Sequence, residues 1–236
     1  MGEILKTTLI TGANRGIGFE FARQLVADDW FVIACNRNSD NSDSLNKLAA
    51  KYPDKIMLHT LDVTNHKQIK KLAQTLSSES IDLLINNAGF YPDRERGCFG
   101  QIDYDAWAYT FLVNTMAPLK MVEEFINHIT KSRKKIIVTI TSKMGSISDN
   151  ARGGSYIYRS SKSALNMVMK STAIDLKSKN IISVLLHPGW VRTDMGGPNG
   201  LISAEQSVSG MLDIIKEFTI DDSGKIFAYD GKIIPW

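Results

Sequence analysis

A phenol and an ammonium group lie four residues apart in the sequence, at Tyr158 and Lys162. If this segment is helical, the spacing places both side chains on one face of the helix. A tyrosine with its ordinary pKa of about 10 is a weak acid–base group at neutral pH, and a neighbouring ammonium lowers that pKa. The pair therefore predicts a general acid–base site. Tyr156 has Ser160 rather than a cation at the equivalent position, so we expect Tyr156 to pack or to form a pocket wall.

Three glycines occur within seven residues near the start of the chain, at Gly12, Gly16 and Gly18. An apolar run at 7–10 precedes them, and an amphipathic segment through Val26 follows. The order strand, tight turn and helix lets backbone N–H groups at a helix N-terminus bind a diphosphate. An ordinary strand-to-helix turn does not explain so many glycines. We therefore predict a dinucleotide site here.

The second predicted strand ends in Asn36 and Arg37, without a carboxylate. In NAD-selective folds an acidic residue about 20 positions beyond the glycine turn binds the ribose 2′-hydroxyl. Arg37, together with Arg15 in the glycine turn, can instead pair with a 2′-phosphate. Asp40 and Asp43 lie farther along and are interpreted as loop or capping residues. The expected cofactor is NADP(H), with NAD(H) as the alternative.

Short β-rich segments alternate with amphipathic segments along the whole chain of 236 residues. The interior segments are continuous apolar runs, as expected for a parallel sheet buried on both faces. We therefore predict an α/β fold over residues 1–236, a single Rossmann-type domain with about seven mainly parallel strands and helices on both faces. The expected strands are 7–11, 31–35, 56–61, 83–86, 135–141, 181–187 and 225–229, and the main helical segments beyond the first are 67–76, 107–129, 160–176 and 204–218.

Composition excludes several classes of function. A net charge of +3 without a clustered basic patch argues against a nucleic-acid partner. The sequence contains neither a signal peptide nor an apolar stretch of the ~18 residues that a membrane span needs. Cys35 ends an apolar run, which predicts a buried free thiol, and no zinc-ligand spacing occurs, so no metal is expected. These features predict a cytoplasmic protein.

Together the motifs resemble the short-chain dehydrogenase/reductase family over essentially the whole chain. The glycine turn resembles the cofactor turn of that family, Asn86-Asn87-Ala88-Gly89 its second marker, and 187–193 the segment that closes on nicotinamide. More narrowly, 156–166, 187–197 and 229–236 resemble the sniffer/C-factor branch, which is related to carbonyl reductases. The cofactor-binding residues that we expect are Gly12, Asn14, Arg15, Gly16, Ile17, Gly18, Asn36, Arg37, Asp62, Val63, Asn87, Ala88, Gly89, Pro188, Gly189, Val191 and Thr193.

Asp62 and Val63 follow the third predicted strand and resemble the pair that contacts adenine in this family. An alternative interpretation is that Asp62 caps the helix that begins near Asn65.

The resemblance also implies four catalytic roles. Tyr158 would exchange a proton with the substrate oxygen, Lys162 would lower the pKa of Tyr158 and hold the nicotinamide ribose, and Ser142 would donate a hydrogen bond to the developing alkoxide. Asn114 would hold a water that connects Lys162 to solvent. Ser142 precedes Tyr158 by sixteen positions, a longer spacing than is frequent in the family, and Ser146 is the rival. Ser142 is preferred because it directly follows the strand.

The implied function is NADPH-dependent reduction of a small or medium carbonyl compound. The alternatives are an NAD(P)-binding signalling protein similar to C-factor and a dehydrogenase that oxidises an alcohol. We expect 90–100 and 193–200 to form the rim of the substrate pocket, with Met195 as a candidate contact. The family usually associates through the two long helices near 107–129 and 160–176, which predicts a homodimer or homotetramer. Carbonyl reductases of this general kind can be monomers, which is the alternative.

Overall fold

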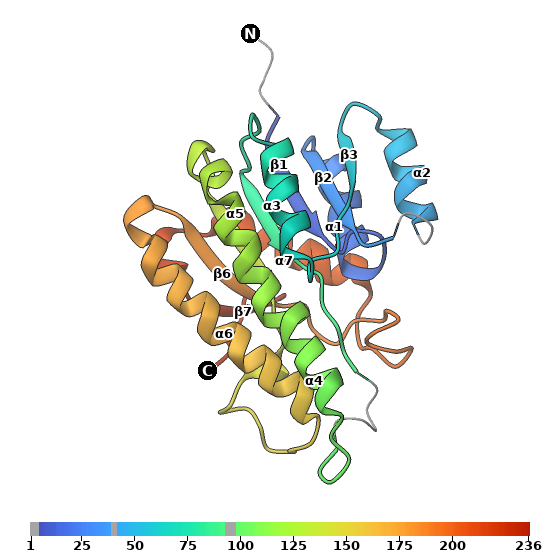
Figure 1. The fold of residues 1–236 in the computed structure, drawn as a ribbon, viewed down its shortest axis with the longest axis vertical. Helices are drawn as coiled ribbons and strands as arrows, with labels where there is room; N and C mark the ends of the chain where they lie inside the picture. Colours follow the sequence, from blue (N-terminus) through green and yellow to red (C-terminus); the bar gives the residue numbers. More distant parts are fainter. Residues whose placement is uncertain (1–4, 39–41, 93–97) are drawn as a thin grey trace.

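Within residues 5–38, 42–92 and 98–236, which the computed structural model describes, seven parallel strands form one sheet (Figure 1). The strand order β3-β2-β1-β4-β5-β6-β7 runs outward from β1 in one direction and from β4 in the other, which defines a doubly wound α/β sheet. The predicted fold class is confirmed. The strands are β1 (Thr7–Thr11), β2 (Phe31–Asn36), β3 (Ile56–Thr60), β4 (Leu83–Asn86), β5 (Ile136–Ile140), β6 (Ile182–His187) and β7 (Ile226–Ala228).

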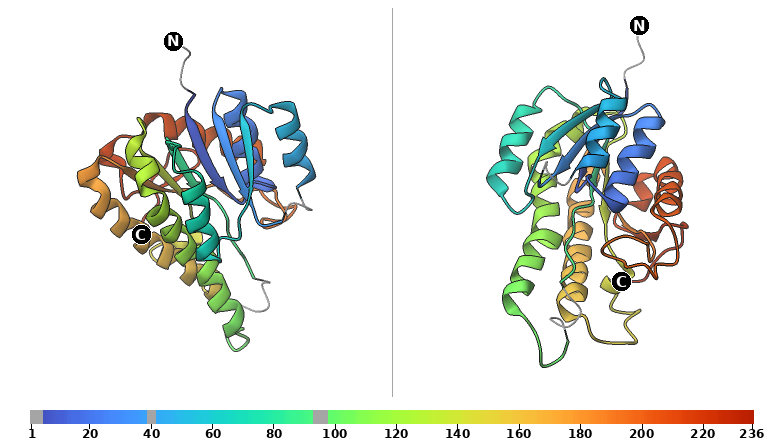
Figure 2. Two further views of the ribbon diagram at one scale, coloured as in Figure 1. Left: turned by 45° about the horizontal axis from the view of Figure 1, so that its top comes forward. Right: turned by 90° about the vertical axis from the view of Figure 1, so that its right-hand side faces the viewer.

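Helices cover both faces of the sheet, as the two views in Figure 2 show. Phe21 of α1 and Met211 of α7 join a buried apolar cluster on one face. Phe125 of α5 and Met169 of α6 join a second cluster, which α3 completes, on the other face. The helices are α1 (Gly16–Ala27), α2 (Asp43–Lys51), α3 (His66–Thr75), α4 (Tyr104–Phe111), α5 (Ala117–Lys131), α6 (Tyr156–Leu176) and α7 (Ala204–Glu217), with short helical turns η3 (Leu112–Met116), η4 (Lys143–Gly145), η5 (Lys177–Lys179) and η6 (Ile220–Asp222).

Successive residues of the central strands enter opposite clusters. Leu9 lies in the cluster of α3, α5 and α6, whereas Ile10 lies in the cluster of α1 and α7. Leu84 and Ile85 of β4 divide in the same way, and all four side chains have no exposed surface. Burial on both faces explains why these strands consist of continuous apolar residues.

Two helical regions differ from the expectation. The helix predicted over 107–129 consists of α4 and α5 joined by η3, a π-helical turn that contains Asn114. Helix α2 is absent from the main helical segments expected from the sequence. Leu45 is its only fully buried side chain among the described residues, and Leu48 and Ala49 on the same face pack only partly against the core. Asp43 lies in the first turn of α2 rather than in a loop, and Asp40 lies outside the described residues.

The buried thiol predicted at Cys35 is confirmed, since Cys35 lies in β2 and forms no disulfide. Burial raises the pKa of this thiol to about 12, so it stays protonated. Among the described helices, none combines the length and the apolar character that crossing a membrane requires.

Candidate active site

The predicted site residues gather at the carboxyl ends of the strands. Gly12 to Gly18 follow β1, Asn87 to Gly89 follow β4, and Pro188 to Thr193 follow β6. Strands β1 and β4 are the neighbours at which the strand order reverses, the usual position of a ligand crevice in such sheets. Ser142 lies two residues beyond β5, and Tyr158 and Lys162 lie in the first two turns of α6.

Ser142 and Tyr158 are joined by a hydrogen bond between their hydroxyl groups. Ser142 is also the N-cap of η4, where its Oγ accepts the N–H of Met144 at 3.1 Å, so its position is fixed by the backbone. The rival Ser146 has other partners, since its hydroxyl donates to the carbonyl of Trp236 at 3.2 Å and accepts the N–H of Asp149. The geometry therefore brings Ser142, rather than Ser146, to the phenol.

Lys162 is 4% exposed and lies one helical turn after Tyr158. Its Nζ donates to the carbonyl of Ile140 at 2.9 Å and lies 5.8 Å from the centre of the Tyr158 ring. Burial lowers the pKa of Lys162 to about 8. Gly145 allows this close packing, because a Cβ there would lie 2.8 Å from the Cβ of Lys162.

The pKa of Tyr158 differs from the expectation. Burial raises it to about 12, and the hydrogen bond from Ser142 acts in the opposite direction without outweighing burial. The predicted lowering of this pKa by Lys162 is not found, and the Lys162 ammonium donates instead to the carbonyl of Ile140. At neutral pH Tyr158 is therefore a protonated phenol that can donate a proton.

Asn114 is fully buried in η3 and uses its amide to join three segments. Its Oδ1 accepts the N–H of Phe90 at 2.8 Å, and its Nδ2 donates to the carbonyl of Phe90 and to the hydroxyl of Ser161. The loop after β4 is thereby tied to α6, the helix of Tyr158. A water between Asn114 and Lys162 stays a prediction.

The glycine turn has the geometry that a diphosphate requires. A Cβ at Gly18 would lie 2.2 Å from the carbonyl oxygen of Gly12 and 2.4 Å from Nδ2 of Asn87, so only glycine fits. The same Nδ2 donates to the carbonyls of Thr11 and Gly12. Helix α1 has neither a side-chain cap nor an acidic residue in its first turn, which leaves its N-terminal N–H groups for an anion. The residues present thus fit a dinucleotide cofactor.

The two arginines predicted to select the cofactor bind protein groups in this structure. Arg15 forms an exposed ion pair with Asp194 at 2.7 Å, and Arg37 donates to the hydroxyl of Tyr109 at 3.0 Å. Asn36 is buried, and its amide donates to the carbonyl of Asn38 and to another side chain. A carboxylate at position 36 would face that carbonyl oxygen, so Asn36→Asp would disturb the loop as well as the cofactor site.

The segments after β3 and β6 complete the predicted cofactor surface. Asp62 accepts hydrogen bonds from the N–H and the hydroxyl of Thr64, whereas Asn65 caps α3. The alternative interpretation of Asp62 as the helix cap is therefore wrong. Val63 is 9% exposed and belongs to the core. Thr193 lies against the glycine turn, 3.4 Å from where a Cβ of Gly16 would be.

Tyr91 and Ser155 are contacts of the site that motif analysis misses. The Tyr91 ring packs edge-on against the Tyr158 ring at 4.5 Å, and its hydroxyl shares a hydrogen bond with Ser155 at 3.2 Å. Ser155 precedes α6 with a left-handed backbone (φ 48°). The signal for Tyr91 is its place in the predicted rim at 90–100, of which 93–97 lie outside the described residues.

Apolar side chains are exposed near the start of α6 and after β6. Phe99 is 88% exposed, and its ring lies 6.4 Å from that of Tyr156, which is itself 42% exposed. Met195 is 52% exposed, as is expected of a residue on a pocket rim.

Comparison with known proteins gives a consistent result. The chain matches the family described as short chain dehydrogenase over residues 6–200. It is 39% identical to C-signal of Myxococcus xanthus over 169 aligned residues. The aligned region covers 71% of this chain and 100% of that protein. The chain therefore belongs to the short-chain dehydrogenase family and is an oxidoreductase of that family.

Solved structures point to one branch of the family. The NADPH-bound carbonyl reductase from chicken fatty liver has a TM-score of 0.91 and 32% identity, covering 99% of this chain and 100% of that chain. The carbonyl reductase Sniffer of D. melanogaster has a TM-score of 0.92 and 28% identity, with the same coverage. The predicted likeness to this branch is thus confirmed.

Proposed function

We propose that this protein is an NADPH-dependent carbonyl reductase in which Tyr158 is the proton donor. The observation that carries the proposal is the hydrogen-bonded pair of Ser142 and Tyr158, with Lys162 one turn away, beside a glycine turn that fits a dinucleotide. The similarity to an NADPH-bound carbonyl reductase supports NADP(H) as the cofactor.

The protein side of the reaction follows from these positions. When bound, the cofactor supplies the hydride, and the chain supplies position and a proton. Ser142 orients the substrate oxygen by a hydrogen bond, and Tyr158 donates its proton to that oxygen as negative charge develops. Lys162, whose pKa is about 8, supplies a positive charge at neutral pH beside the ribose site.

The raised pKa of Tyr158 predicts how the rate in each direction depends on pH. Reduction needs the protonated phenol, which is present throughout the neutral range when the pKa is about 12. Oxidation of an alcohol needs the phenolate. Below the pKa of Tyr158, the phenolate fraction grows tenfold for each unit by which the pH rises. A panel of carbonyl and alcohol substrates, followed by the absorbance of reduced nicotinamide between about pH 6 and 7, where Lys162 with its pKa of about 8 keeps its charge, should show a flat rate of reduction and a rising rate of oxidation. A rate of reduction that rises with pH over this range, or a rate of oxidation that does not, would contradict a protonated Tyr158 as the proton donor.

Cofactor choice is tested at Arg37. A guanidinium–phosphate pair contributes roughly 1.5–3 kcal/mol, so Arg37→Ala should weaken NADPH binding by roughly ten- to a hundred-fold. NADH binding should change little, because NADH has no 2′-phosphate. Tyr109→Phe is the matched control, since it removes the neutral partner of Arg37 and keeps the charge. If titration shows that the unaltered protein binds NADH more tightly than NADPH, Arg37 does not select the cofactor.

A second candidate function is signalling, which the 39% identity to C-signal favours. A protein that only binds NAD(P) needs the glycine turn but does not need Ser142, Tyr158 and Lys162 in hydrogen-bonding geometry. The substrate panel separates the two functions, because a pure binding protein would oxidise or reduce none of the substrates at any pH.

Self-association is a further part of the proposal. Met167 and Ile174 of α6 are 65% and 64% exposed, and Met116 of η3 is 49% exposed. Apolar side chains of this kind on the long helices suit a homodimer or homotetramer. We expect light scattering to give a mass above that of one chain, and Met167→Glu with Ile174→Glu to reduce it. A single-chain mass for the unaltered protein would disprove association through this face.

A further inference from the structure

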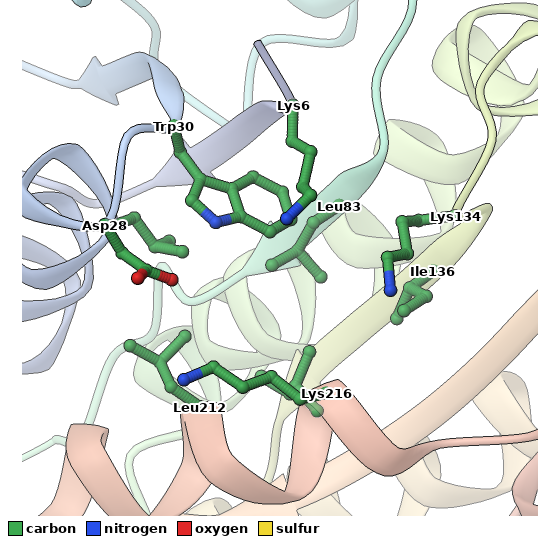
Figure 3. A pocket seen from close by; sticks show the side chains of 10 residues that line it. Lys6, Asp28, Trp30, Leu83, Lys134, Ile136, Leu212 and Lys216 are labelled. Carbon is green, nitrogen blue, oxygen red and sulfur yellow. The ribbon is translucent and has the colours of Figure 1, made fainter. Parts of the chain in front are cut away.

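A pocket that the proposed reaction does not use lies at the amino ends of the strands (Figure 3). Leu83 and Ile136, the first residues of β4 and β5, form part of its wall. Leu212 of α7 and Asp28, which follows α1, bound it from the helical side. Because parallel strands place their carboxyl ends at the opposite edge, this pocket and the Tyr158 site lie at opposite ends of the sheet.

The inner surface of the pocket is apolar and formed by core side chains of which only small parts are exposed. Leu83 has no exposed surface, Ile136 is 4% exposed, and Trp30 and Leu212 are each 8% exposed. All four belong to the buried cluster beneath α1 and α7. A site built from core side chains exists before a ligand arrives, so binding requires little reordering.

The outer part of the pocket is positively charged. Three lysines, Lys6, Lys134 and Lys216, line it together with a single carboxylate, Asp28. Nζ of Lys6 lies 5.5 Å from the centre of the Trp30 ring. The ion pair of Lys216 with Asp213 is long, at 3.7 Å, and no carboxylate of the described chain pairs with Lys6 or Lys134.

We propose that this pocket binds a small amphipathic organic anion, with its carboxylate at the lysines and its apolar part against Trp30. A neutral apolar molecule would make no use of the ammonium groups, and a bare inorganic anion would make no contact with the exposed edges of Trp30 and Leu212. The combination of charged rim and apolar wall therefore selects a ligand with both parts.

Calorimetry with octanoate as the probe tests this assignment. We expect one octanoate per chain, with 1-octanol and acetate binding at least about tenfold more weakly. The double variant Lys134→Glu/Lys216→Glu should weaken octanoate binding by at least about tenfold. Lys70→Glu/Lys71→Glu on the exposed face of α3 is the matched control, because it makes the same change in net charge away from the pocket. The milder pair Lys134→Gln/Lys216→Gln, checked by its thermal unfolding, keeps the test valid if charge reversal disturbs α7.

The alternatives give different results. The proposal would be overturned if octanoate still binds to both double variants of Lys134 and Lys216, or if 1-octanol binds equally well. The absence of binding at millimolar octanoate would also overturn it. Binding that Tyr158→Phe abolishes and the lysine pairs leave intact would place octanoate in the active site instead, and this too would overturn it. The outcome does not depend on the proposed reductase function, because calorimetry needs no turnover. Both double variants of Lys134 and Lys216 should reduce carbonyl compounds at the same rate as the unaltered protein.

Discussion

Replacement of Tyr158 by phenylalanine is expected to lower kcat by roughly 10²–10⁴-fold, the usual contribution of a positioned proton donor. The ring and its edge-on contact with Tyr91 remain, and only the hydroxyl that Ser142 binds is lost. Steady-state kinetics with NADPH and any carbonyl that the unaltered protein reduces measures the loss. NADPH affinity, measured by fluorescence titration, should stay nearly constant.

Tyr156→Phe is the matched control for this experiment. Tyr156 lies on the same helix two residues earlier, is exposed, and has Ser160 rather than a lysine four residues ahead of it. It should keep most of its rate. A Tyr158→Phe protein that is as active as the Tyr156→Phe protein would remove Tyr158 from the mechanism.

Lys162→Met should have two opposite effects, lower activity and higher stability. Turnover and NADPH binding should both fall, because the variant loses the positive charge beside the predicted ribose site. Stability should rise, because folding buries the ammonium and lowers its pKa from 10.5 to about 8. A difference of that size corresponds to about 3 kcal/mol, and loss of the hydrogen bond to Ile140 offsets about 1 kcal/mol of it.

The pH dependence of that stability gives an independent check. The folded state binds the Lys162 proton less tightly than the unfolded state does, so the cost of burial is complete below about pH 8 and disappears as pH rises toward 10.5. Denaturant titration should therefore show a stability advantage of Lys162→Met of about 2 kcal/mol at pH 7, which shrinks at higher pH. Lys170→Met, on the same helix but outside the site, should show no loss of turnover. A less stable Lys162→Met protein would contradict the buried charge.

The sheet could be predicted because its physical signal is local. Strands buried on both faces, such as β1 and β4, must be apolar at every position, and the close contact of Gly18 with Gly12 requires glycine. Helix α2 is short and has only one fully buried residue, so its apolar spacing at Leu45, Leu48 and Ala49 is a weaker signal. A residue that is packed on all sides can be of few amino-acid types, so the sequence indicates buried strands more clearly than a partly exposed helix.

The electrostatics of the site could not be predicted in the same way. The spacing of Tyr158 and Lys162 indicates their proximity, but their pKa values depend on burial and on the carbonyl of Ile140, to which Lys162 turns. The ion pair of Arg15 with Asp194 joins residues 179 positions apart. Such contacts depend on how loops from different strands meet, which spacing along the chain does not specify.

The way in which Asn114 holds Phe90 has a consequence for the diversification of this enzyme. Both atoms that Asn114 binds in Phe90, the N–H and the carbonyl, belong to the backbone. Every amino acid except proline offers the same two groups, so substitutions beyond this anchor leave the attachment to α6 unchanged. The loop therefore keeps its attachment through its backbone, so side chains beyond Tyr91, which itself packs on Tyr158, can vary in evolution or in engineered libraries without loss of this anchor.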